Sequence, residues 1–157
     1  MLIELNDCEK VVRDRMEEDI RRPNIEYDGS ITTFLRAVDR DISDGVVRIL
    51  NHTYDSVKYY LKDLDLSPYV YQLGSAYLLY LSLSSGRTSP LHLQRGKHTA
   101  ALLSLPPATG KSMIICLLCA LVCQGKQDTV DKIVISFTNE VLYEKDRKLY
   151  EGMQQVF

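Results

Sequence analysis

The longest apolar run of the chain, MIICLLCALVC at residues 113–123, limits what the sequence can fold into. A helix made of such residues is hydrophobic on every side, so all of its surface has to be covered. The run is well short of the roughly 20 apolar residues that a membrane span requires. We therefore expect a buried helix. A chain of 157 residues, 45% of them hydrophobic and 25% charged, is long enough to enclose it.

The residues on both sides of this run predict alternating strands and helices. TAALLSL (99–105) is a short apolar run suited to a buried strand, and KIVISF (132–137) is a β-branched strand. Helices are expected at 110–124 and 139–153. The order strand, helix, strand, helix is typical of a parallel sheet with right-handed crossovers. The expected fold class is therefore α/β.

The first half of the chain predicts helices. Apolar residues recur at helical spacing over 6–22, 30–38, 45–61 and 68–83. Asn6 or Asp7 is expected to cap the first of these helices, and Ser30 the second. Residues 84–98, rich in Ser, Gly and basic residues, predict an exposed connection. We expect a helical region at 1–90 and the α/β part at 91–157.

A loop with the sequence PPATGKS joins the first expected strand to the apolar helix at residues 106–112. Gly110, Lys111 and Ser112 match the end of the phosphate-loop pattern G-x-x-x-x-G-K-[ST], whereas Leu105 stands at its first glycine. Backbone amides of 108–112 would face the phosphates at the helix N-terminus, where the helix dipole favours negative charge. Lys111 would bind the β- and γ-phosphates, and the Ser112 hydroxyl would complete the coordination of Mg²⁺.

Three residues of this loop are unusual for a phosphate loop. Pro106 and Pro107 lack N–H groups, but they stand on the strand side of the turn, where fewer amides face the phosphates. Ala108 would cost about 1 kcal/mol if its position requires a positive φ. The alternative is a plain turn capped by Ser112, which leaves Lys111 unexplained. We predict nucleotide binding, with ATP and Mg²⁺ as ligands and the amides of Ala108 and Thr109 in the cradle.

Three segments resemble the superfamily-two ATPases, and most of all the SecA preprotein-translocase branch. PPATGKS is similar to motif I of that family. KIVISFTNEVLYEKD is similar to its next motif, with these residues in register: Asn139, Glu140, Leu142, Lys145 and Asp146. YVYQLGSAYLL resembles the upstream segment of the family that carries an adenine-contacting glutamine. The resemblance implies that role for Gln72, with Gln94 as its rival. It covers about residues 97–153, and 68–83 as a further piece.

The resemblance implies the start of a RecA-like P-loop domain that binds ATP, in a family related to protein translocation. In that family hydrolysis needs a later strand ending in an Asp-Glu pair, and a second RecA-like domain that supplies arginines. The sequence ends at Phe157 before either part, and the acidic pair Glu17-Glu18 lies in the first expected helix. We therefore expect an incomplete domain, a fragment or truncated relative of a larger motor, that does not hydrolyse ATP efficiently.

Cysteine and tyrosine clusters each allow two interpretations. Cys116, Cys119 and Cys123 could bind a soft metal, but their neighbours are Ile, Leu, Ala and Val, which favours small buried side chains. Seven of the 10 Tyr lie between Tyr54 and Tyr80 and could stack on bases. Their helical spacing with Leu and Val favours packing between helices.

Net charge and targeting signals limit which partners and which location we expect. The formal net charge is −2, so charge gives no support to a nucleic-acid partner. The N-terminus lacks the apolar segment of a secretory signal, and free thiols fit a reducing, cytoplasmic location. Two alternatives stay open. One is an interaction module with a degenerate loop, which would need a protein partner or a missing C-terminal half. The other is a fragment of an RNA or DNA helicase.

Overall fold

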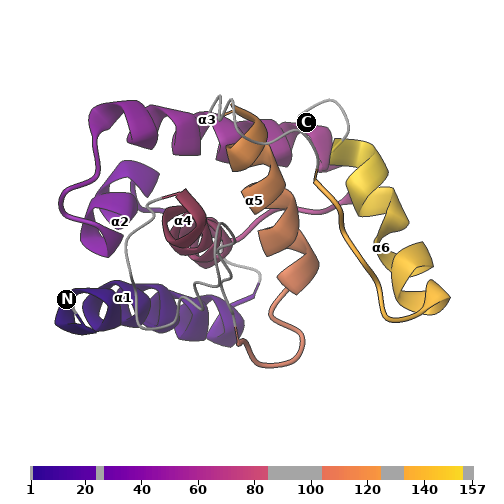
Figure 1. The fold of residues 1–157 in the computed structure, drawn as a ribbon, viewed down its shortest axis with the longest axis horizontal. Coiled ribbons are helices and arrows are strands. Elements are labelled where there is room, and N and C mark those ends of the chain that lie inside the picture. The colour runs from indigo at the N-terminus through magenta and orange to yellow at the C-terminus, as the bar shows by residue number, and fades with distance from the viewer. Residues whose placement is uncertain (1, 24–26, 85–103, 125–132, 154–157) are drawn as a thin grey trace, which may run out of the picture.

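The computed structural model of the chain describes residues 2–23, 27–84, 104–124 and 133–153 (Figure 1). These residues form six α-helices and a short 3₁₀ turn at Lys62–Leu64. The helices are α1 (Leu2–Arg21), α2 (Ile31–Val38), α3 (Asp44–Tyr60), α4 (Val70–Ser84), α5 (Lys111–Gln124) and α6 (Glu140–Met153).

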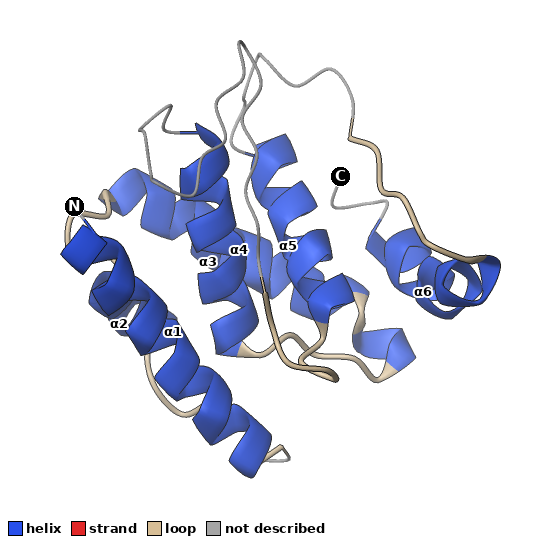
Figure 2. Cartoon of the chain, turned by 60° about the horizontal axis from the view of Figure 1, so that its bottom comes forward, coloured by secondary structure: helices blue, strands red, loops and turns tan. Residues whose placement is uncertain are grey.

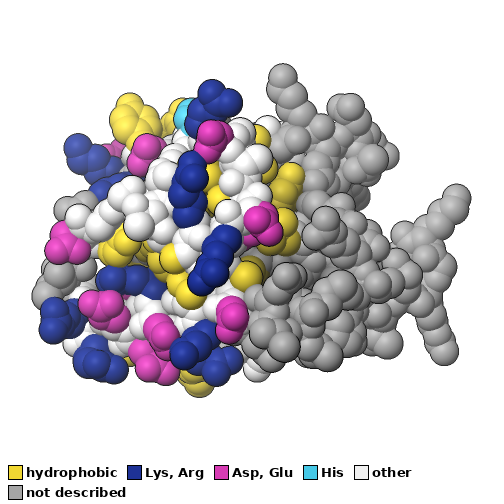
Figure 3. All heavy atoms as spheres, turned by 90° about the vertical axis from the view of Figure 1, so that its left-hand side faces the viewer, with side chains coloured by type: hydrophobic (Ala, Val, Ile, Leu, Met, Phe, Trp, Pro, Cys, Tyr) yellow, Lys and Arg dark blue, Asp and Glu magenta, His cyan; other side chains and the backbone are white. Residues whose placement is uncertain are grey.

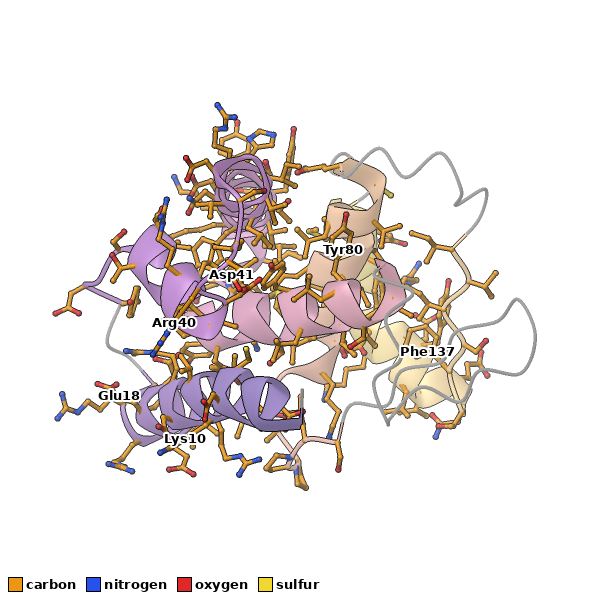
Figure 4. The ribbon with its side chains drawn as sticks, turned by 60° about the vertical axis from the view of Figure 1, so that its left-hand side comes forward. Lys10, Glu18, Arg40, Asp41, Tyr80 and Phe137 are labelled. Carbon is orange, nitrogen blue, oxygen red and sulfur yellow. The ribbon has the colours of Figure 1, made fainter. Side chains whose placement is uncertain are left out.

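The expected α/β fold with a RecA-like parallel sheet is wrong, because no residue that the structure describes belongs to a strand (Figure 2). From residue 133 the expected strand at 132–137 is irregular chain, and most of the one expected at 99–105 lies outside the described residues. A strand is stable only beside a neighbour that takes its backbone hydrogen bonds. Phe137 packs edge-on against Tyr143 and Tyr150 of α6 instead, with ring centroids 5.6 and 5.9 Å apart (Figure 4).

Helix α4 lies at the centre of the fold, with α1, α2, α3 and α5 around it and α6 beyond α5 (Figure 1). Leu73 and Ala76 of α4 are fully buried, as are Leu117 and Ala120 of α5. The prediction of a buried helix at 110–124 is confirmed, because helices α3 and α4 cover α5 where a sheet was expected. In the parts of the chain that the structure describes, no helix has both the length and the hydropathy of a membrane span.

The helices predicted in the first half of the chain are confirmed, although their ends differ. Ser30 caps α2 as predicted, its Oγ accepting a hydrogen bond from the Thr33 N–H at 3.4 Å. The expected start of the first helix at Asn6 or Asp7 is wrong, because α1 begins at Leu2 and both positions lie inside the helix. Residues 2–7 contain no glycine or proline, which would disfavour a helix, so α1 can begin upstream of the expected cap.

Polar side chains connect α3 to its neighbours inside the core. The Thr53 hydroxyl, which is fully buried, donates to Gln124 Oε1 at the end of α5 at 2.7 Å. The Tyr54 hydroxyl donates to the Pro68 carbonyl at 2.7 Å, just before α4. Tyr54, Tyr71 and Tyr77 are at most 7% exposed, so packing between helices is confirmed for these tyrosines. The division into regions 1–90 and 91–157 stays a prediction.

Candidate functional site

The loop before α5 makes a sharp turn through two residues in the left-handed region. Ala108 has a φ of +62° and Gly110 a φ of +71°. The Pro106 carbonyl accepts two hydrogen bonds across the turn, from the Thr109 hydroxyl at 2.8 Å and from Lys111 Nζ at 3.2 Å. Ala108 therefore has the positive φ at which its Cβ was expected to cost about 1 kcal/mol. Glycine is preferred in this conformation because it has no Cβ.

Side chains of α4 form buried hydrogen bonds with this turn. The Thr109 carbonyl accepts hydrogen bonds from the Tyr71 hydroxyl at 2.7 Å and from Gln72 Nε2 at 3.2 Å. Gln72 Oε1 accepts from the Tyr69 N–H at 2.8 Å, so its amide joins the start of α4 to the loop. Burial raises the pKa of Tyr71, which keeps the phenol protonated and able to donate.

Gly110 lies directly against the Gln72 amide. A Cβ built on Gly110 would collide with Gln72 Nε2, and its positive φ already disfavours other residues. Glycine is therefore favoured here for two reasons, the positive φ of the backbone and the close approach of the Gln72 side chain of α4.

Helix α5 begins immediately after Gly110. The Gly110 carbonyl accepts from the N–H groups of Met113 at 3.0 Å and Ile114 at 3.3 Å, which starts the helical hydrogen bonding. The N–H groups of Lys111 and Ser112 have no acceptor within the helix, as in any first turn. The loop therefore presents amides that have no acceptor within the helix, the positive end of the helix dipole and an exposed lysine side by side.

Ser112 contacts α6. Its hydroxyl donates a hydrogen bond to the Asp146 carboxylate, on the helix that follows in the chain. In the sequence Asp146 stands in the segment that resembles a motif after the loop, and nothing in the pattern places it beside Ser112. The packing of α6 on α5 decides that contact, and no spacing in the sequence encodes it.

The structure brings together the residues that were predicted to form the site. Ala108, Thr109 and Gly110 form the turn, Lys111 and Ser112 follow it, and Gln72 touches it from α4. Gln94, the rival of Gln72, lies outside the described residues. Tyr71 and Asp146 were not predicted as site residues.

The cysteines of α5 do not share one environment. Cys116 is fully buried and Cys119 is 6% exposed, which confirms small buried side chains at these positions, whereas Cys123 is exposed. Burial raises the pKa of the Cys119 thiol to about 11, and that of Cys116 further. Both are protonated and unreactive near neutral pH.

The chain matches no protein-family model, no curated protein and no solved structure. The geometry of the loop and the side chains that surround it therefore carry the functional inference.

Proposed function

We propose that residues 106–112 bind the phosphates of ATP together with Mg²⁺. The observation that carries this proposal is the pair of left-handed residues, Ala108 and Gly110, which brings the loop onto the N-terminus of α5 next to Lys111. First-turn amides and a helix dipole attract anions. Lys111 adds a full positive charge that a plain turn does not need.

The position of Lys111 is compatible with this role. Its ammonium group is exposed and bonded to a neutral acceptor, the Pro106 carbonyl, at 3.2 Å. A hydrogen bond between two charged groups is roughly twice as strong as one between neutral groups. A phosphate at the loop would therefore compete effectively with the carbonyl for Lys111.

Gln72 supports the loop in this proposal. Both groups of its amide are engaged, one with the Tyr69 N–H and one with the Thr109 carbonyl, and the side chain is 4% exposed. Contact with adenine remains a prediction for Gln72. We propose that its first role is to fix the carbonyl of Thr109, so that the amides after it keep their direction.

The oxygen atoms near the loop are suited to Mg²⁺. The Ser112 hydroxyl lies beside the Asp146 carboxylate, and Mg²⁺ prefers oxygen ligands. A bound Mg²⁺ would neutralise part of the phosphate charge. The wider assignment to a protein-translocating motor is supported by the resemblance of short segments alone, so the proposal is limited to nucleotide binding.

The face of the molecule drawn in Figure 3 gives no added support to the helicase alternative. On the face shown in Figure 3, basic and acidic side chains are interspersed over the described residues. Lys10 and Glu18, both exposed, project from α1 in this mixed pattern (Figure 4). A nucleic-acid track is usually marked by basic residues gathered on one face.

Binding of a fluorescent ATP analogue in the presence of Mg²⁺ tests the proposal. Loss of a hydrogen bond to a charged group costs about 1.5–3 kcal/mol, so Lys111→Ala should weaken binding by about 10- to 100-fold. Lys10→Ala removes the same charge from α1 and should leave binding unchanged. Equal or absent binding in the wild type and Lys111→Ala would mean that PPATGKS is only a turn.

A second candidate, a protein-interaction module, is favoured by apolar side chains exposed on and before α6. Val134 is 70% exposed and Val141 77%, and Ile133, Leu142 and Tyr143 are more than 40% exposed. Large apolar residues exposed close together in the sequence are candidates for an interaction surface. Sedimentation of the wild type and of the double variant Val134→Ser/Val141→Ser tests self-association through this surface. Identical monomeric behaviour of both would count against a surface that pairs copies of the chain.

A further inference from the structure

Ser112 and Asp146 bring an alcohol and a carboxylate together at the mouth of α5. The two residues are separated by 34 positions in the sequence, and the Ser112 hydroxyl donates to an Asp146 oxygen. A hydroxyl has one proton and two lone pairs, so Ser112 can keep this hydrogen bond while a lone pair faces a cation. The pair therefore offers two oxygen ligands on one side of the loop.

Asp146 has no cationic partner in the described part of the chain. The ion pairs of α6 are formed by Arg147, with Glu144 at 3.1 Å and Glu151 at 3.4 Å. Lys111, the nearest lysine in sequence to Ser112, points its ammonium group at the Pro106 carbonyl. Asp146 is thus a partly buried carboxylate that forms no ion pair with a cationic side chain of the described residues.

Besides Ser112, two further groups of α5 and α6 lie near Asp146. Cys116 lies one turn after Ser112 and Tyr150 one turn after Asp146. Burial is the main cause of their raised pKa values, and the nearby Asp146 charge raises both further. The Tyr150 hydroxyl is buried and has no hydrogen-bond partner among the described residues. A buried hydroxyl without a partner costs stability, which indicates that a further polar group belongs at this place.

We infer that Asp146 is a ligand of the Mg²⁺ that accompanies the nucleotide, together with the Ser112 hydroxyl. Mg²⁺ is commonly held by one or two carboxylates, by phosphate oxygens and by several waters. A metal-bound water would give the Tyr150 hydroxyl its missing partner. Helix α6 thereby supplies the carboxylate that was expected to follow a later strand. This inference rests on the proposed function of the loop.

The opposing interpretation is that the pair only joins α5 to α6. Such a hydrogen bond would contribute to the stability of the fold but would not respond to a metal. The two interpretations differ in their effect on the coupling between Mg²⁺ and nucleotide, which can be measured without any turnover.

The experiment compares the affinity for a fluorescent ATP analogue in EDTA with the affinity in excess Mg²⁺. In the wild type we expect Mg²⁺ to tighten binding. Asp146→Asn should keep the affinity measured in EDTA but lose the gain from Mg²⁺, by about tenfold or more, since even the loss of a group that only supports a metal ligand costs about 10- to 100-fold in metal affinity. Ser112→Ala should lose the gain as well. Free Mn²⁺ can also be titrated by electron paramagnetic resonance with the nucleotide present. The wild type should bind Mn²⁺ more tightly than Asp146→Asn and Ser112→Ala.

Glu144→Gln is the matched control, because it removes one negative charge from the exposed face of the same helix. It should retain the full gain from Mg²⁺. If Asp146→Asn and Ser112→Ala both retain the wild-type gain, the inference is overturned while nucleotide binding stands. If the wild type binds no nucleotide in either buffer, the proposed function fails and the metal site fails with it.

Discussion

The side-chain amide of Gln72 on α4 donates a hydrogen bond to the carbonyl of Thr109, 37 residues further along the chain. The same amide accepts from the Tyr69 N–H, so one buried side chain fixes both the start of α4 and the turn before α5. Because buried polar groups are costly when unpaired, the two contacts depend on each other. The conformation of the candidate phosphate loop is therefore coupled to the packing of the central helix.

Gly110→Ala should destabilise the protein strongly. The new Cβ would collide with Gln72 Nε2 and would also adopt an unfavourable positive φ, so we expect a loss of about 2–4 kcal/mol in the free energy of unfolding. Urea denaturation measures this loss. Gly45→Ala is the control, since the nearest atom to its Cβ would be Ser43 Oγ at 3.9 Å, and it should be neutral or stabilising.

The collision itself can be isolated by a double-mutant cycle. Combining Gly110→Ala with Gln72→Ala should cost less than the sum of the two single changes, because the truncated side chain no longer meets the new Cβ. Strictly additive values would contradict the close approach of Gly110 to Gln72.

Ala108→Gly should leave the protein as stable or raise its free energy of unfolding by up to about 1 kcal/mol. Relief of the left-handed alanine is offset in part by the greater freedom of glycine in the unfolded chain. Ala37→Gly, at an exposed position of α2, should instead cost about 1 kcal/mol. The free energies of unfolding of the two variants, measured by thermal and urea unfolding, should therefore differ by at least about 1 kcal/mol, with Ala108→Gly the more stable. Equal losses would argue against the positive φ of Ala108.

Tyr71→Phe should destabilise the protein by about 1 kcal/mol, the typical value of a hydrogen bond, because the Thr109 carbonyl loses one of its two donors. The ring packing is unchanged, so the loss reports the hydroxyl alone. Tyr59, which is 73% exposed, provides the control, and Tyr59→Phe should change stability by only a few tenths of a kcal/mol. A loss in Tyr59→Phe as large as that in Tyr71→Phe would remove the support for this contact.

The thiols of α5 should differ in reactivity at pH 8. Cys123 is exposed and should react rapidly with a thiol reagent, whereas Cys116 and Cys119 should react only after unfolding. Loss of a rapid phase in Cys123→Ser would identify that thiol. Rapid modification of Cys119 in the native protein would contradict its burial.

The raised pKa of Cys119 also predicts a pH dependence of stability. Folding retains a proton that the unfolded chain releases near pH 9.0, because burial raises the thiol pKa to about 11. The folded state binds more protons in this window, so the free energy of unfolding falls as pH rises from 9.0 to about 11. Cys119→Ala should show a shallower fall over the same range in urea titrations. An identical slope in both proteins would mean that Cys119 titrates normally.

Local signals predicted the helices, and non-local contacts decided the rest. Ser30 predicts the start of α2 because its hydroxyl accepts a hydrogen bond from the N–H group three residues later. This contact is local, so it can be predicted without knowing the fold. The segment 132–137 has the composition of a strand, but a strand depends on a neighbour that composition does not reveal. In the structure Phe137 packs on aromatic residues of α6, and its segment forms no sheet among the described residues.

The same distinction between local and non-local contacts holds for the candidate site. Gly110, Lys111 and Ser112 stand together in the sequence, so their joint position at the N-terminus of α5 follows from a helix that starts there. The contact between Ser112 and Asp146 depends on how α6 packs, which periodicity cannot supply. Gln72 was assigned by resemblance, and its hydrogen bonds to Tyr69 and Thr109 define a supporting role that the resemblance did not contain.

The hydrogen bond from Tyr71 to the Thr109 carbonyl gives the loop an optical readout. The chain contains no tryptophan, so its near-ultraviolet absorption comes mainly from its 10 tyrosines. The absorption band of a phenol shifts when the hydroxyl loses or changes its acceptor. Any rearrangement of the loop that moves the Thr109 carbonyl should therefore appear in the difference spectrum of the unlabelled protein, and should vanish in Tyr71→Phe.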